Sequence, residues 1–124
     1  MFLCILLTMK KQSLSIINTE SVTKRLNGDT FLIDALYRIY PKQIRYYMQD
    51  IEESLQNENF CQIAANSHSL KSCFQAVGAE FCEDTNQRLL NAIRTEKLEN
   101  VPQLVKNLRN EMEKLFILIN KGQS

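Results

Sequence analysis

Residues 59–78 read NFCQIAANSHSLKSCFQAVG, and the spacing of their apolar side chains decides the fold. An α-helix turns by about 100° per residue, so positions can be placed around its axis. With Ile63 set at zero, four further apolar side chains fall within about 60° on either side: Phe60, Leu70, Phe74 and Val77. One narrow apolar stripe is typical of a helix that packs one face against other helices. Gly78 is a common type of C-terminal stop. The stretch therefore predicts a helix over about 59–77 within a helical bundle.

The single histidine of the chain lies well away from this apolar stripe. His68 falls at about 140° from Ile63 and Gln75 at about 120°, while Lys71 falls at about 80°, on the flank of the stripe. We therefore expect His68 to face solvent. Residues three or four apart are neighbours on one face of a helix, so His68 is expected to share its surface with Lys71, Ser72 and Gln75.

Small side chains surround the histidine on the predicted helix and are expected to leave its ring accessible: Ala64, Ala65, Ser67 and Ser72. Lys71 can place an ammonium group near an anion attached to the imidazole and donate hydrogen bonds to it. A neutral imidazole can act as a nucleophile. Exposure, access and a nearby cation are what a reversible phosphoryl carrier needs. Two simpler interpretations are a histidine bonded near the core, which the helix geometry argues against, and an exposed histidine without a role.

The rest of the chain continues the helical pattern. Apolar residues at helical spacing predict further helices over these approximate ranges: 19–26, 30–55, 80–94 and 102–119. Pro41 is expected to kink or divide the second of them, because proline removes a backbone donor and clashes with the preceding turn. No stretch alternates apolar and polar residues as a strand would. These features predict an all-α fold, an antiparallel up-and-down four-helix bundle with a short additional N-terminal helix, over residues 19–121.

Composition and cysteine usage exclude several classes of function. The 124-residue chain has a formal net charge of +1, which implies no bulk attraction to nucleic acid or to anionic membranes. Its four cysteines form no C-x-x-C pair, so we expect them to be reduced and the protein to be cytoplasmic. Cys61, Cys73 and Cys82 lie in apolar helical patterns and are expected to pack as small hydrophobes. No compact cluster of cysteines accompanies His68, so no metal site is expected.

Two other features have ordinary interpretations. Short basic clusters are taken as solvated faces rather than a nucleic-acid surface, and four tyrosines as packing at the core edge: Tyr37, Tyr40, Tyr46 and Tyr47. The apolar start of the N-terminal segment 1–18 is too short to span a bilayer, which takes about 20 residues. It also lacks the basic leader of a secretory signal, so no membrane insertion is expected. Residues 1–8 are interpreted either as preceding the true start at Met9 or as an extra turn packed on the domain.

The segment HSLKSCFQAVGA, which starts at His68, resembles the histidine-containing phosphotransfer (HPt) domain, whose motif is H-x-L-K-G followed by an apolar residue and G-A. The resemblance extends over about 19–120 and implies that His68 is phosphorylated, that Lys71 stabilises the phosphoryl group and that Gly78 closes the helix. Ser72 stands where the family usually has glycine. Serine is still a small residue, and its hydroxyl can donate a hydrogen bond to the phosphoryl group. Its side chain nevertheless narrows the approach to the imidazole.

The resemblance also directs attention to the surroundings of the histidine. Helical position indicates a candidate docking rim with these members: Ala64, Ala65, Ser72, Gln75 and Ala76. Some members of the family bond their histidine from a glutamine on the following helix. Leu90 occupies that position by sequence offset, and the role is not transferred to Gln87.

The implied function is phosphorelay signal transduction. His68 is expected to accept a phosphoryl group from a receiver-domain aspartate and to pass it to another receiver domain. Expected partners are response-regulator receiver domains and hybrid sensor histidine kinases, with Mg²⁺ bound by the receiver and no cofactor on this chain. The sequence holds no G-x-x-x-x-G-K-[ST] or G-x-G-x-x-G motif, so we expect a carrier and not a kinase. The alternative is a helical docking module that binds receivers or other proteins without phosphate chemistry.

Overall fold

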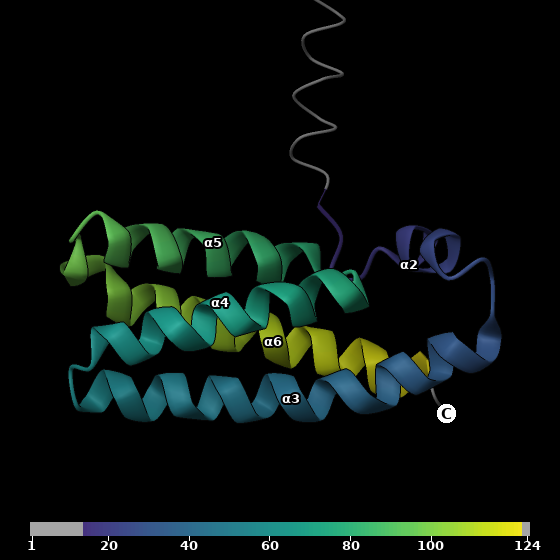
Figure 1. The fold of residues 1–124 in the computed structure, drawn as a ribbon, viewed down its shortest axis with the longest axis horizontal. Coiled ribbons are helices and arrows are strands. Elements are labelled where there is room, and N and C mark those ends of the chain that lie inside the picture. The colour runs from purple at the N-terminus through teal and green to yellow at the C-terminus, as the bar shows by residue number, and fades with distance from the viewer. Residues whose placement is uncertain (1–13, 123–124) are drawn as a thin grey trace, which may run out of the picture.

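A computed structural model describes residues 14–122 of the chain. Over that range it forms four long α-helices, shorter helices and no strand. Figure 1 shows the long helices side by side, with the short helix α2 at one end. The elements are α2, Thr19–Arg25; α3, Thr30–Gln56; α4, Phe60–Val77; α5, Glu80–Arg94; the 3-10 helix η1, Leu98–Asn100; and α6, Val101–Gly122. The all-α bundle predicted from the sequence is confirmed.

The four long helices pack in a ring, in which each contacts two others. α4 packs against α3 and α5, and α6 packs against α5 and α3 (Figure 1). Side-chain caps begin three of the helices: Asn18 accepts from the Ser21 amide, Asp29 from the Phe31 and Leu32 amides, and Asn59 from the Gln62 amide. Such caps satisfy backbone donors that the first helical turn leaves free. The short connections make successive long helices antiparallel.

Of the two outcomes expected at Pro41, a kink or a division, the structure shows no division of the helix. α3 continues through Pro41 as one helix, although its N-terminal part runs out of line with the rest in Figure 1. Proline removes one backbone hydrogen bond, at a cost of about 3 kcal/mol in a helix interior. Side chains on both sides of it pack on the core, Leu36 and Tyr40 before it and Ile44 after it. Their packing offsets the lost bond.

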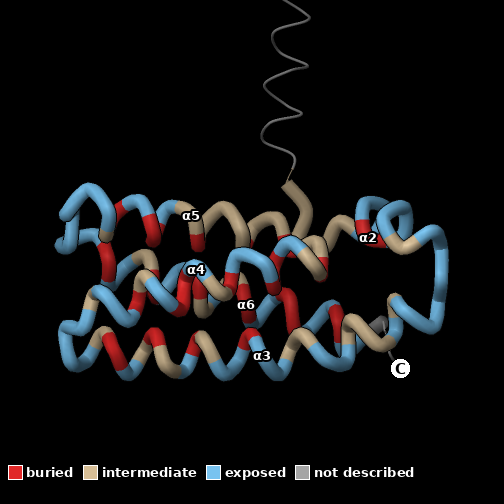
Figure 2. The backbone as a smooth tube through the Cα atoms, in the orientation of Figure 1, coloured by how far each residue is buried: buried red, intermediate tan, exposed pale blue. Residues whose placement is uncertain are grey.

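The core lies between the inward faces of the four long helices, as the red segments of Figure 2 show. On α4 the predicted stripe is buried at Ile63, Leu70, Phe74 and Val77, with Phe60 half-buried at its edge. α6 contributes a matching set of buried side chains: Val101, Val105, Leu108, Met112, Leu115, Phe116 and Ile119.

The prediction that all four tyrosines pack at the core edge is wrong for Tyr46. Tyr37, Tyr40 and Tyr47 are half-buried against the core as expected, but Tyr46 is 70% exposed. It follows the buried Ile44 by two residues, which is about 200° around the helix, so it points outward.

Residues near the start of the described range hold the C-terminal end of α4. The Asn18 amide donates to the Gly78 carbonyl over 2.7 Å, and the Tyr37 hydroxyl donates to the Val77 carbonyl over 2.9 Å. Arg25 donates from its guanidinium to the carbonyls of Gln75 and Ala76. Burial raises the pKa of Tyr37, and the nearby charge of Arg25 partly opposes this. Side chains of α2 and α3 therefore satisfy carbonyls that the end of α4 leaves free.

The N-terminal segment is only partly within the described residues. The Ser15 amide donates to Glu80 Oε1 over 3.0 Å, and the Phe81 amide donates back to the Ser15 carbonyl over 3.3 Å, so this part contacts the start of α5. The expectations for residues 1–8 lie outside the described residues. Between residues 14 and 122, no helix is long and apolar enough to cross a membrane.

Candidate functional site

His68 is exposed near the middle of α4, as predicted, and so are Lys71, Ser72 and Gln75. All four side chains line one open groove of about 440 Å³. Over residues 14–122, the side chains of His68 and Lys71 make no hydrogen bond or ion pair. The groove therefore combines an accessible imidazole with an unpaired ammonium group.

The other wall of the groove comes from α3, which sequence reasoning missed. Tyr40, Gln43 and Tyr47 line it. The Cys73 thiol, within 3.8 Å of Gln43 Oε1, marks where α3 and α4 meet. Gln43 and Cys73 lie equally far along the chain from Glu58, in the turn between the two helices. Pairing residues at equal distances from that turn is the sequence signal that would have found this wall.

The Ser72 hydroxyl is turned toward the backbone of its own helix. Its Oγ donates to the Ser69 carbonyl over 3.0 Å. The hydroxyl proton is therefore donated within α4, although Ser72 lines the groove together with His68. Ser72 adds bulk beside the imidazole where the family usually has glycine.

Gln75 connects the site to α5. Its Nε2 donates to Glu83 Oε1 over 3.1 Å, an acidic contact that the sequence analysis did not anticipate. One donor of the Gln75 amide is thus already bonded to a carboxylate on the neighbouring helix.

The prediction that small, accessible side chains surround the histidine is wrong for Ser67. It is fully buried, and its Oγ donates to Asn86 Oδ1 on α5 over 2.7 Å. The physical reason is its position four residues after Ile63, which places it about 40° from the centre of the apolar stripe. Of the other small residues one turn before His68, Ala65 is exposed and Ala64 is half-buried.

The predicted docking rim is only partly assembled in the groove. Ser72 and Gln75 line it with His68, whereas Ala64, Ala65 and Ala76 are not among its lining residues. Ala76 is half-buried, and its carbonyl accepts from Arg25.

The position on α5 from which some family members bond their histidine holds no polar side chain. Leu90 is there by sequence offset and is buried, so it offers no hydrogen bond. Gln87 donates from Nε2 to Asn91 Oδ1 over 3.0 Å. The His68 ring therefore has no partner from α5 among the described residues.

The cysteines of the described range are free thiols, but they differ in burial. Cys73 and Cys82 are buried as predicted, and burial raises the pKa of both, that of Cys82 to about 12. The prediction for Cys61 is wrong, because this residue is exposed; it lies about 160° from Ile63 on α4. Residues 14–122 contain no group of three or more His, Cys, Asp or Glu side chains that could hold a metal ion.

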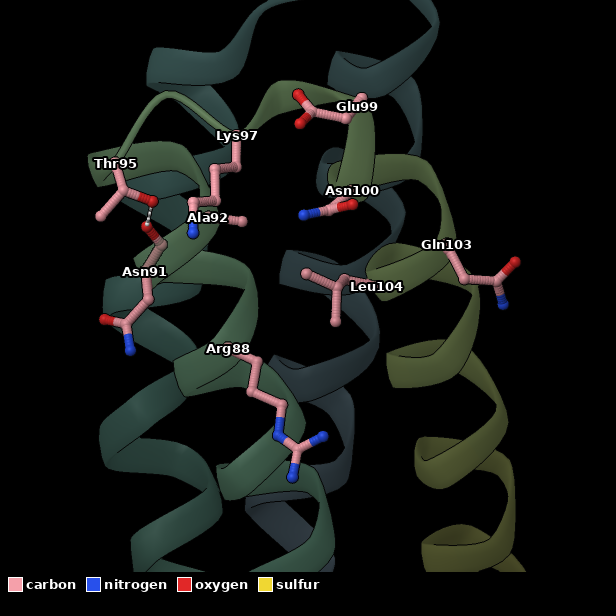
Figure 3. A pocket seen from close by; sticks show the side chains of 9 residues that line it. All are labelled: Arg88, Asn91, Ala92, Thr95, Lys97, Glu99, Asn100, Gln103 and Leu104. Carbon is pink, nitrogen blue, oxygen red and sulfur yellow. Dashed lines mark hydrogen bonds between the residues drawn. The ribbon is translucent and has the colours of Figure 1, made fainter.

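A separate cavity of about 550 Å³ lies between α5, η1 and α6. Figure 3 shows that Lys97, Asn100 and Leu104 point toward it, and that Thr95 donates to the Asn91 carbonyl at its edge. Its rim is exposed and polar, and it shares no residue with the groove around His68. Of the cavity and the groove, only the α3–α4 groove contains the single histidine of the chain.

The fold and the groove define a helical-bundle protein that presents a histidine and a free lysine on one face. Comparison with known families shows which bundle this is: residues 35–116, more than half of the chain, match the model of the Hpt domain. The chain belongs to the Hpt domain family, the histidine phosphotransfer proteins of phosphorelays. Proteins of this family are phosphocarriers rather than kinases, and they interact with receiver domains.

A solved structure has the same fold. The crystal structure of histidine-containing phosphotransfer protein B (HptB) from Pseudomonas aeruginosa PAO1 matches with a TM-score of 0.81 and 15% sequence identity. The match covers 89% of this chain and 96% of that one. A search of curated proteins found no match.

Proposed function

We propose that His68 is the phosphorylated residue of this phosphotransfer protein. The observation that carries the proposal is that the only histidine of the chain is exposed in a groove beside an unpaired lysine. A histidine carrier needs an imidazole that a bulky donor protein can reach. His68 meets that requirement, and no second histidine competes with it.

The transfer step moves a phosphoryl group between an aspartyl phosphate and the imidazole. The ring nitrogen, Nε2 in our proposal, attacks phosphorus in line, so that a P–N bond forms as the P–O bond to the aspartate breaks. The aspartate carboxylate leaves with the electron pair of that bond. The proton on the other ring nitrogen passes to solvent. The reverse steps deliver the phosphoryl group to a second receiver domain.

Lys71 stabilises the phosphoryl group in this proposal. The phosphoryl group on His68 carries negative charge, and a charge-assisted hydrogen bond from an ammonium group favours that state. Lys71 has no carboxylate partner over residues 14–122, so no existing ion pair must break before it binds the phosphoryl oxygens. Ser72 and Gln75 border the phosphoryl group, and Gly78 ends the helix that presents it.

The receiver supplies the remaining chemistry. Mg²⁺ bound by the receiver and the receiver's own side chains are assigned the stabilisation of charge in the transition state. The carrier requires no cofactor of its own and catalyses no other reaction in this proposal. Its partners are receiver domains of response regulators or of hybrid sensor histidine kinases. The free thiols of Cys61, Cys73 and Cys82 support a cytoplasmic location.

The test is phosphoryl transfer from a labelled receiver domain of the same organism. We expect wild type to take up acid-labile, base-stable label and His68→Gln to take up none. Lys71→Ala should be labelled at least about tenfold more slowly, since it loses the charge-assisted bond. Thr23→Ala, at an exposed position of α2, is the surface control. If wild type stays unlabelled with every receiver of its organism, a docking module without phosphate chemistry is the better interpretation.

A further inference from the structure

Two consecutive residues of α4, immediately before His68, are hydrogen-bonded to the helices on either side. Asn66 Nδ2 donates to Asp50 Oδ2 of α3 over 2.6 Å. Ser67 Oγ donates to Asn86 Oδ1 of α5 over 2.7 Å, and Asn86 Nδ2 donates back to the Ser67 carbonyl over 2.9 Å. Asn66, Ser67 and Asn86 are at least 95% buried. We call these four bonded residues the α4 clamp: Asp50, Asn66, Ser67 and Asn86.

The clamp opposes rotation and sliding of α4 in the bundle. Asn66 and Ser67 differ by about 100° around the helix, so one points to α3 and the other to α5. His68 then points about 150° away from the direction midway between them, toward solvent. Hydrogen bonds require a narrow range of distance and angle. A rotated α4 would lose both sets of bonds and leave buried polar groups unpaired, which is costly.

The buried polar groups therefore add directional selection against other arrangements of α4 to the selection that apolar packing provides. Leu70 and Phe74 fill the core, but apolar contacts are non-directional and tolerate small shifts. Over residues 14–122, no buried side-chain nitrogen or oxygen lacks a hydrogen-bond partner. The bonding pattern is thus complete in the observed rotation of the helix.

We propose that Asn86 and Asp50 are positioning residues for phosphoryl transfer, which hold α4 so that the His68 ring meets the incoming phosphorus in line. This inference rests on the proposed role of His68. Neither residue lines the groove or reaches the reacting atoms. In-line attack is sensitive to placement, and an error of about 1 Å can cost about a hundredfold in rate.

Of these two residues, we expect Asn86 to have the larger effect on the position of α4. It is 2% exposed and forms a reciprocal pair of bonds with Ser67, the residue next to the histidine. Asp50 is half-buried and also accepts from Gln62 Nε2 over 3.0 Å, so its hold on α4 is shared between two residues.

The first measurement compares Asn86→Leu with wild type as the concentration of phosphorylated receiver is varied. Leucine is similar in size to asparagine but makes no hydrogen bond. We expect the maximal transfer rate constant to fall at least about tenfold, with the half-saturating receiver concentration unchanged within about twofold. Asn91→Leu is the matched control, because it changes an exposed, hydrogen-bonded asparagine of the same helix and should leave both values unchanged.

A second variant separates positioning from stability. The double variant Ser67→Ala with Asn86→Leu removes both polar side chains, so no hydroxyl is left buried without a partner. Replacing both members of a bonded pair by apolar groups can be nearly neutral for stability. We expect this variant to keep its helical structure on heating as wild type does. It should still transfer the phosphoryl group slowly. Relaxation measurements on the His68 backbone amide should show greater mobility than in wild type.

The outcomes distinguish the two proposals. If wild type takes up no label, the role of His68 fails and the clamp fails with it. If wild type is labelled and the double variant transfers at the wild-type rate, only the positioning role is overturned. It is also overturned if Asn86→Leu raises the half-saturating concentration alone, because the defect would then lie in docking.

Discussion

Gly78 lies directly against Val22, with no room for a side chain between them. A Cβ on Gly78 would be 2.9 Å from Val22 Cγ2 and 2.9 Å from the Asn18 carbonyl oxygen. The backbone of Gly78 also has a φ of 73°, in the left-handed region that glycine adopts most easily. Two separate features therefore require glycine where α4 ends and α2 packs across it.

Gly78→Ala should destabilise the bundle by about 2–5 kcal/mol. A left-handed backbone costs about 1–2 kcal/mol for a residue with a Cβ, and overpacking adds about 1–3 kcal/mol. Urea unfolding followed by circular dichroism measures the change. Gly28→Ala is a matched control: its φ is 71°, but the space around it is open. We expect it to lose only the backbone part, about 1–2 kcal/mol. Equal losses of unfolding free energy in the two variants would show that the close contact with Val22 does not contribute to the destabilisation.

Ser72→Leu should block phosphoryl transfer while leaving the fold intact. Ser72 is exposed and lines the groove with His68, so a leucine there places four carbons beside the imidazole. We expect the transfer rate to fall at least about tenfold, because a donor can no longer align with the ring. Lys106→Leu, on a helix that contributes nothing to the groove, adds the same exposed side chain elsewhere. A Ser72→Leu protein that transfers as fast as this control would contradict the assignment of the groove.

Arg109 and Glu52 should be energetically coupled across the α3–α6 contact. The guanidinium binds the carboxylate through two nitrogens, with Nε 3.0 Å from Glu52 Oε2, and Nη1 binds Glu113. The hydrogen bond to Glu52 raises the pKa of Arg109, against the lowering effect of burial. Both side chains are about one-third exposed, so we expect a coupling of about 1 kcal/mol.

A double-mutant cycle with Arg109→Met and Glu52→Gln measures that coupling. It isolates this pair from Glu113, because the bond to Glu113 is lost in both Arg109→Met proteins. High salt should reduce the coupling only partly, since the pair is partly buried. Strictly additive effects of the two substitutions would mean that the pair contributes nothing.

The bundle should lose stability as the pH rises above about 9. Burial and the charge of Glu111 raise the pKa of the Cys82 thiol from 9.0 to about 12. Between these values the unfolded chain releases a proton that the folded chain retains. Unfolding is then favoured by about 1.4 kcal/mol for each pH unit and each such thiol. The raised pKa values of Cys73 and Tyr37 act in the same direction.

Cys82→Ala identifies the contribution of that thiol. Its free energy of unfolding should fall less steeply than that of wild type between about pH 9 and pH 10, whatever its value at neutral pH. Cys61→Ala, which removes an exposed thiol, is the comparison and should keep the wild-type slope. The prediction does not survive if Cys82→Ala and wild type have the same slope.

The helices and the exposure of His68 were predictable because both depend on the chain near each residue. The spacing of Ile63, Leu70, Phe74 and Val77 places the apolar stripe, and the same rotation places His68 outside. The prediction that Ser67 is accessible failed because it considered only the small size of this side chain. It overlooked that helical rotation places Ser67 close to the apolar stripe. The prediction for Tyr46 failed in the same way, because its position about 200° from the buried Ile44 places it outside. Pro41 shows a different limit, since packing of α3 on the core keeps the helix continuous through the proline.

The sequence by itself thus determined that this chain is a bundle of amphipathic helices with one exposed histidine beside a lysine. Only the tertiary structure decided which residues of other helices line the groove or bond α4 beside it: Tyr40, Gln43 and Tyr47 line the groove from α3, and Asn86 and Glu83 of α5 bond Ser67 and Gln75. The physical reason is that helical periodicity specifies the direction of a side chain on its own helix. The side chain that it meets depends on how far each helix slides and rotates against its neighbours, which the packed core and the buried hydrogen bonds of α4 decide together.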